Sequence, residues 1–128
     1  MRIACITTKP NARLPERAGT SGVFALRSRH EMSLKSGSYY LYSTGLVLNL
    51  PAGYMCRISE SHDARTEHIY CSPFFVVSGY ETEIILRLVN TSDSDVDISE
   101  DIRLFDLVVL HSPCRPNDEF YFAGRVPE

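Results

Sequence analysis

The sequence predicts an all-β fold, arranged as a jelly roll or distorted β-barrel. Apolar residues fall in short runs, and the runs are separated by turns rich in Gly, Pro, Asn and Ser. No long stretch has the apolar period of a helix. Many short strands at close spacing with polar turns are typical of sandwiches and barrels. The 128 residues are 44% hydrophobic, which suits one domain with one core.

Each predicted strand is an apolar run that ends at a turn. The run 83–89 is the clearest, because it is rich in β-branched and aliphatic residues and stops at a polar Asn-Thr-Ser-Asp turn. Pro51, Pro73 and Pro113 fall between runs, as strand hydrogen bonding requires. In chain order, the predicted strands are 23–26, 39–42, 46–48, 55–58, 69–71, 74–77, 83–89, 96–98 and 104–110. The predicted core residues are Leu46, Leu48, Ile84, Leu86, Leu88, Leu104, Leu107 and Val109.

The chain is expected to form a single domain, 1–128, with an N-terminal arm at 1–12 and a C-terminal arm at 115–128. The C-terminal arm carries three adjacent aromatic residues, Phe120, Tyr121 and Phe122. They could form a final strand on their own domain. Alternatively, the arm could reach a neighbouring subunit, since a terminal strand is easily exchanged in an oligomer.

The composition argues against two classes of partner. The net charge of −3 argues against a nucleic-acid-binding protein, although several arginines crowd residues 13–29. No apolar run approaches the roughly 20 residues that span a bilayer, and the N-terminal run is too short for a signal peptide. We therefore expect a cytosolic protein with reduced cysteines and no membrane span.

Two pairs of residues have a spacing that suggests zinc. They are His68 with Cys71, and His111 with Cys114. In a strand, however, positions i and i+3 point to opposite faces, so the ligands would not converge. We expect no metal site and no cofactor.

Two polar segments contain residue types that occur in catalytic or cation sites. Residues 61–63 read Ser-His-Asp, but neighbouring side chains diverge and cannot form a catalytic triad. The acidic run 91–101 could hold a hard cation, but Val96 and Ile98 interrupt it. A solvated hairpin with these two aliphatic residues facing inward is the preferred interpretation.

The order and spacing of four segments resemble those of the trimeric dUTPase family. The segments are LPERAGTSGVFAL (14–26), STGLVLNLPAGYMCRI (43–58), GYETEIILRLVN (79–90) and EDIRLFDLVVL (100–110). The resemblance implies a jelly-roll fold and a trimer. It also implies hydrolysis of dUTP to dUMP and pyrophosphate, using magnesium, at sites shared between subunits.

The resemblance places some of the family's site residues on matching residues of this chain. Ser61 matches the serine of the second motif, Tyr80 matches the tyrosine that stacks on deoxyribose, and Arg103 matches the arginine of the fourth motif. These three residues would form a vestigial nucleotide pocket.

Other positions depart from the family pattern. Ala25 takes the place of an acidic residue, and Glu60 takes the place of a phosphate-binding arginine. Val77 and Gly79 fall where the family has aspartates, Asp106 falls where it has glutamine, and the glycine-rich fifth motif is missing. Without a carboxylate, general-base activation of water and metal binding would fail. On this basis we expect a protein that is not an enzyme and has no catalytic residues.

Two segments also resemble the noncatalytic dUTPase-like adaptors of adenoviral early region 4. They are LPERAGTSGVFALRS (14–28) and LPAGYMCRISES (50–61). This resemblance implies a viral early protein that binds host signalling proteins of the phosphoinositide 3-kinase type. It also implies a location in the host cytoplasm, with the nucleus as an alternative. The alternatives left open are a dUTP pyrophosphatase and a nucleotide-binding sensor without turnover.

The partner-binding surface is expected on a loop and on the C-terminal arm. The candidate residues are Glu60, His62, Asp63, Phe120, Tyr121 and Phe122. The chain ends in Arg125-Val126-Pro127-Glu128, which departs from a PDZ ligand. The proline lacks a backbone donor and Glu128 does not suit an apolar pocket, so no PDZ binding is expected.

Overall fold

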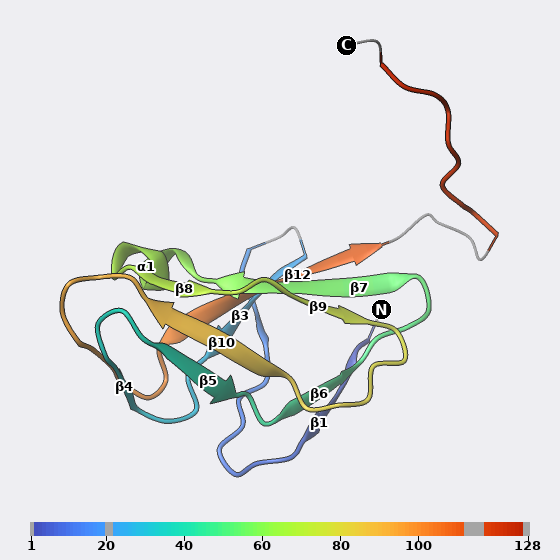
Figure 1. Ribbon diagram of the computed structural model, residues 1–128. Coiled ribbons are helices and arrows are strands. Elements are labelled where there is room, and N and C mark those ends of the chain that lie inside the picture. The colour runs from blue at the N-terminus through green and yellow to red at the C-terminus, as the bar shows by residue number, and fades with distance from the viewer. Residues whose placement is uncertain (1, 20–21, 112–116, 127–128) are drawn as a thin grey trace.

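Strands form almost all of the regular structure in the residues described by this computed structural model, which are 2–19, 22–111 and 117–126 (Figure 1). The all-β prediction is confirmed. The strands are β1 (Ala4–Thr7), β2 (Glu16–Arg17), β3 (Val23–Arg27), β4 (Met32–Leu34), β5 (Tyr39–Ser43), β6 (Leu46–Asn49), β7 (Tyr54–Glu60), β8 (Ile69–Cys71), β9 (Phe74–Val77), β10 (Ile85–Asn90), β11 (Val96–Ile98) and β12 (Arg103–His111). One short helix, α1 (His62–Thr66), follows β7.

The strands pair antiparallel in four separate sheets. The largest sheet has the order β2-β3-β12-β7-β9, and the second has the order β5-β10-β8. Two pairs, β1 with β6 and β4 with β11, complete the fold. Figure 1 shows β12, β7 and β9 in one layer, with β10, β5 and β6 in a layer below it. This arrangement is an open jelly roll, and the sheets of the described residues do not close into a barrel.

The core lies between these two layers. Phe105 of β12 and Tyr42 of β5 meet there, with ring centroids 5.3 Å apart. The predicted core is confirmed for Leu46, Leu48, Ile84, Leu86, Leu88, Leu104 and Leu107, all of which are buried. Val109 is only half-buried, because its side chain lines a cavity.

Helix α1 begins at a serine cap. Ser61 has an extended backbone, and its Oγ accepts a hydrogen bond from the backbone N–H of Ala64 at 3.1 Å. A cap of this kind satisfies one of the free donors of the first turn. The buried methyl group of Ala64 then fixes the helix against the core.

The two terminal segments differ in how they contact the domain. Residues 4–7 of the N-terminal segment form β1 and pair in register with β6. Residues 117–126 form no strand, and Figure 1 shows them extending away from the body. Phe120, Tyr121 and Phe122 are at least 81% exposed. No helix in the described part of the chain is long and apolar enough to cross a membrane.

Candidate functional site

A β-bulge in β12 brings Arg103 and Asp106 to the same side of the strand. Arg103 lies opposite Arg27 of β3, but the pairing shifts by one residue before Phe105, which lies opposite Leu26. In a regular strand, residues i and i+3 point to opposite faces, and the extra residue of a bulge changes this. Asp106 Oδ1 therefore accepts a hydrogen bond from Arg103 Nε at 2.9 Å and forms an ion pair with Arg103 Nη2 at 2.8 Å.

Ser61 joins this strand to helix α1. Its Oγ donates to the carbonyl oxygen of Arg103 at 2.9 Å, and its backbone N–H donates to the carbonyl of Leu104 at 2.9 Å. The residue is 1% exposed. Its hydroxyl thus holds α1 against β12 and is not on the surface that a ligand would reach.

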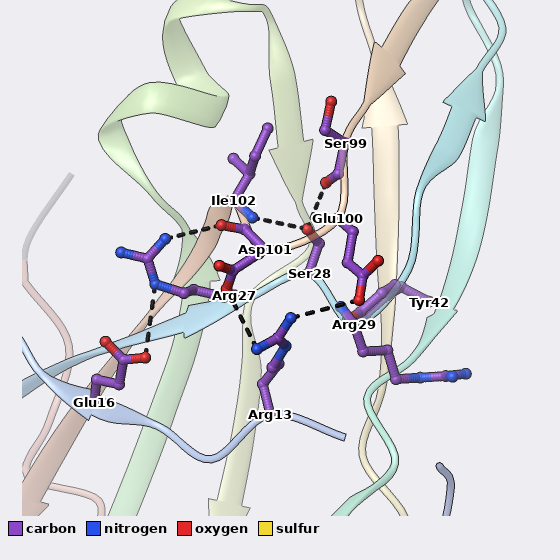
Figure 2. A network of polar contacts seen from close by, with 10 residues as sticks. All are labelled: Arg13, Glu16, Arg27, Ser28, Arg29, Tyr42, Ser99, Glu100, Asp101 and Ile102. Carbon is purple, nitrogen blue, oxygen red and sulfur yellow. Dashed lines mark hydrogen bonds and ion pairs between the residues drawn. The ribbon is translucent and has the colours of Figure 1, made fainter. Parts of the chain in front are cut away.

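Arg27 extends the cationic surface across to β3 (Figure 2). Its Nη1 donates to the carbonyl oxygen of Asp101 at 2.9 Å, and its Nε lies 3.7 Å from Glu16 Oε1. Arg13 lies on the other side of the same turn, with its two Nη atoms 3.5 Å from Glu100 and Asp101 carboxylate oxygens. Both arginines remain partly exposed, so these pairs are weak and screened by salt.

A fully buried serine fixes the turn that precedes Arg103. Ser28 Oγ donates to the carbonyl oxygen of Ser99 at 2.7 Å and accepts from the backbone N–H of Ile102 at 3.0 Å (Figure 2). Asp101 in this turn has a left-handed backbone with φ of 66°. The buried hydrogen bonds of Ser28 hold that conformation and so determine where Arg103 enters β12.

An acidic cavity of about 620 Å³ lies between α1, β11 and the start of β12. Arg103 is the only basic residue among its described lining residues. The carboxylates in the lining are Asp63, Glu67, Asp95 and Asp97. A polyanion would be repelled from this side of Arg103.

A second cavity, of about 570 Å³, is mainly apolar and lies near β1, β6 and the far end of β12. Tyr54 and His111 at its rim have ring centroids 4.7 Å apart. Cys5 and Cys56 also line it, and burial raises the pKa of the Cys56 thiol to about 12. A thiol held in this state is a poor nucleophile, so the cavity has the character of a packing surface.

The other predicted site residues are dispersed. Glu60 is half-buried at the end of β7, and His62 and Asp63 are exposed at the start of α1. Tyr80 lies in the turn after β9, where its ring packs edge-on against Phe74 at 6.0 Å. Within one subunit, the structure brings Ser61 and Arg103 together but leaves Tyr80 in a separate turn.

No three His, Cys, Asp or Glu side chains in the described residues gather to hold a metal ion. His68 has a left-handed backbone and is exposed, whereas Cys71 is buried, so this pair does not converge. The second pair cannot be compared, because Cys114 lies outside the described residues. The described side chains therefore include no set of protein ligands for the magnesium ion that the resemblance implies.

Sequence reasoning missed the pairing of Arg27 with Arg103. The sequence places Arg27 directly after the predicted strand 23–26 but does not give the register that sets it opposite Arg103. The bulge in β12 could not be inferred from the sequence. For the same reason, the contact between Arg103 and Asp106 was not expected.

Comparison with known proteins identifies the family. The dUTPase family model matches residues 8–120. A deoxyuridine 5'-triphosphate nucleotidohydrolase of Helicobacter pylori strain P12 is 31% identical over 114 residues, which cover 85% of this chain and 78% of that protein. The enzyme of the same name from Gloeobacter violaceus is 32% identical over 85 residues, which cover 64% of this chain and 58% of that protein.

Solved structures show the same fold. A variant of the Staphylococcus bacteriophage 80alpha dUTPase has a TM-score of 0.82 at 12% identity, over 97% of this chain and 99% of that one. A variant of the dUTPase from phage phi11 of S. aureus has a TM-score of 0.80 at 16% identity, over 97% of this chain and 100% of that one. The jelly-roll prediction is therefore confirmed at the level of the family fold.

These matches correct the functional prediction. The expectation of a noncatalytic adaptor for host signalling proteins, without enzyme activity, is wrong, because the curated relatives are named as nucleotidohydrolases at 29% to 32% identity. The likeness to the adenoviral adaptor finds no support in these matches. The error came from treating the missing carboxylates at Ala25 and Val77 as decisive, whereas the family pattern extends over residues 8–120. The chain belongs to the dUTPase family.

Proposed function

We propose that this chain binds deoxyuridine nucleotides and hydrolyses dUTP to dUMP and pyrophosphate. The observation that carries the proposal is the match to the family over residues 8–120, together with curated relatives named for this reaction. The fold and the retained Arg103 and Tyr80 are consistent with it.

The retained residues suggest separate roles in the site. Arg103 is 38% exposed and presents a guanidinium that suits phosphate oxygens. Tyr80 is partly exposed in its turn and offers an aromatic face to a sugar. Ser61 is buried, and we assign it the structural role of holding α1 beside Arg103. Since Tyr80 and Arg103 lie apart in one chain, a complete site requires two subunits.

Incubation of the purified protein with dUTP and magnesium is expected to release pyrophosphate. Tyr80→Ala should lower kcat/KM by roughly tenfold, because an aromatic contact contributes ~1 kcal/mol or more. Phe75→Ala removes an aromatic ring that is 51% exposed on β9, so it is the matched control and should leave kcat/KM unchanged. Binding of dUTP without turnover would indicate a nucleotide sensor. The absence of both binding and turnover would refute the proposal.

We also propose that the chain forms a homotrimer. The outer face of the β5-β10-β8 sheet carries large exposed apolar side chains, including Tyr39 at 59% and Leu41 at 60%. Arg87 lies opposite Leu41 and places its guanidinium 4.5 Å from the centroid of the Tyr39 ring. Exposed apolar faces of this kind are typical of protein interfaces, and Ile85 and Tyr70 extend this one.

The aromatic arm is a second candidate contact between subunits. Phe120, Tyr121 and Phe122 make no strand with their own domain, and they are the most apolar part of the segment 117–126. We propose that they pack on a neighbouring copy of the chain. The aromatic arm and Glu60 were also predicted to bind another protein, and this stays a prediction.

Light scattering of the purified protein is expected to give the mass of three chains. Leu41→Asp should produce smaller species, because it introduces a charge into the apolar face of the β5-β10-β8 sheet. Ser33→Asp, at an exposed position of β4, is the control and should keep the trimer. A monomeric wild-type protein, or a trimer that resists Leu41→Asp, would contradict this interface.

A further inference from the structure

The apolar cavity of about 570 Å³ lies between the β1-β6 pair and the ends of β3, β7 and β12. Its volume falls within the range of small-molecule pockets. The cavity is hollow because three small residues, Cys5, Gly22 and Cys56, line it where a packed core would hold larger side chains. Gly22 has φ of 72°, and the nearest atom to the place where a Cβ would stand is the carbonyl oxygen of Val109, at 3.8 Å.

The walls of this cavity come mainly from aliphatic and aromatic side chains. Leu48 of β6 and Leu107 of β12 are buried core residues, and Phe24 of β3 and Val109 of β12 complete the inner wall. An apolar group that enters the cavity leaves water and contacts these side chains. Each methylene group buried in this way strengthens binding by about fourfold.

The charge at the rim of the cavity has one sign. Arg17 is the only lysine or arginine among the described lining residues, and these residues include no aspartate or glutamate. The guanidinium carbon of Arg17 lies 5.6 Å from the centroid of the Phe24 ring, which forms part of the wall. None of the ion pairs between described residues includes Arg17. Its guanidinium is therefore available to an anion at the mouth of the cavity.

We propose that this cavity binds a small amphipathic anion, such as a carboxylic acid with an unbranched alkyl chain. The alkyl chain occupies the apolar interior. The carboxylate lies at the rim beside Arg17, whose planar guanidinium matches two carboxylate oxygens. Neither Arg103 nor Tyr80 lines the cavity, so this site is separate from the proposed nucleotide site.

The lining residues favour a singly charged anion over other small ligands. A cationic amphiphile would meet the charge of Arg17, and the described lining residues hold no carboxylate to attract it. The phosphates of a nucleotide carry several charges, which one exposed arginine does not compensate.

The aromatic arm of a second copy is the competing occupant, because residues 120–122 are exposed. An extended peptide would bring backbone polar groups into the apolar space, whereas an alkyl chain carries none. The lining therefore favours the free amphipathic anion, and the arm becomes an outcome that the experiment separates from it.

Calorimetric titration with decanoate tests the site, and one decanoate should bind per chain. Octanoate is two methylene groups shorter and should bind roughly 15-fold more weakly, because less apolar surface is buried. Decanol keeps the chain without the charge. It should bind roughly fivefold more weakly than decanoate at low salt, the contribution of an exposed ion pair, and added salt should reduce this difference.

Arg17→Gln should weaken decanoate binding by roughly fivefold and leave decanol binding unchanged. Arg57→Gln is the matched control, since Arg57 is exposed on β7 and does not line the cavity, and it should alter neither affinity. Val109→Phe places a ring in the cavity and should abolish the binding of both ligands. Thermal melting identifies any variant that does not fold, and Val109→Met serves as a second, smaller change at that position.

The absence of saturable decanoate binding to the wild-type protein would overturn the proposal. Equal decanoate affinity in the wild type and Arg17→Gln, or in the wild type and both folded Val109 variants, would also overturn it. Decanoate binding that requires replacement of residues 120–122 by serine would show that the arm fills the cavity, and this result too would refute the proposal. None of these titrations involves dUTP, so failure of the proposed function would appear separately, as absent hydrolysis beside intact decanoate binding.

Discussion

Phe105→Ala is expected to lower the free energy of unfolding by about 3–5 kcal/mol, the usual cost of removing a buried phenylalanine ring. Phe105 is 0% exposed and packs against Tyr42 at 5.3 Å between ring centroids. Alanine would leave a cavity between the two layers that the surrounding backbone can fill only in part. Equilibrium unfolding in urea measures the change.

The position of Phe105 connects this loss to the candidate site. The ring anchors β12 immediately after the bulge, opposite Leu26 and Glu60. A loosened bulge would also weaken the contact between Asp106 and Arg103. Phe75→Ala, on β9 of the same sheet, is the control, since Phe75 is 51% exposed and its removal should cost under about 1 kcal/mol. Equal losses in the two variants would show that Phe105 does not anchor the core.

Strand positions could be predicted wherever turn residues bound an apolar run on both sides. The strands 69–71, 74–77 and 96–98 have the bounds expected from the sequence. The short strands β1, β2 and β4 were missed, because their few residues carry no clear alternation and depend on the partner strand for their conformation. Helix α1 was missed because five residues are too few to show a helical period.

The candidate site was less accessible to sequence reasoning than the fold. Ser61 was assigned to the nucleotide pocket, whereas its role as a helix cap and its burial depend on the neighbouring strand β12. The pairing of Arg27 with Arg103 joins residues far apart in the sequence, and the bulge between Arg103 and Phe105 has no local signature. Chemistry that depends on register across strands becomes visible only when the strands are paired.

The family assignment shows a related limit. The four segments that resemble the dUTPase family were recognisable from their order, since they contain the strands and turns that the fold requires. Conclusions about activity were drawn from single positions, such as Ala25, where a side chain expected from the resemblance is absent. The register places Asp106 directly opposite Ala25, so the sheet still presents a carboxylate at this point. Single-position reasoning cannot detect a group that enters from a neighbouring strand.

Asn90→Asp is expected to destabilise the fold by at least about 3 kcal/mol at neutral pH, because it places an unpaired charge in the interior. Asn90 is 0% exposed. Its Nδ2 donates to the carbonyl oxygens of Leu34 and Ser94, both at 2.9 Å, and its Oδ1 accepts from the backbone N–H of Ser92 at 2.9 Å. A carboxylate would keep the contact with Ser92 but would turn an oxygen toward two carbonyl oxygens.

The pH dependence of this loss has a defined sign. Burial and the two facing carbonyls disfavour the charged form, so the pKa of the new carboxyl in the folded state would lie above its unfolded value of about 4. The acid form can donate one hydrogen bond to the carbonyl of Leu34 or Ser94. The stability gap between variant and wild type should therefore be smallest below about pH 4 and widen as the pH rises through the folded pKa. Urea unfolding of both proteins at several pH values measures the gap.

Asn49→Asp is the matched control, since Asn49 lies at an exposed position of β6. The same chemical change there should alter stability by less than about 0.5 kcal/mol, with little dependence on pH. A gap for Asn90→Asp that stays constant between pH 4 and pH 8 would show that the new carboxyl remains charged and solvated. In that case the hydrogen bonds of Asn90 would not be what holds β4, β10 and the turn at residues 91–95 together.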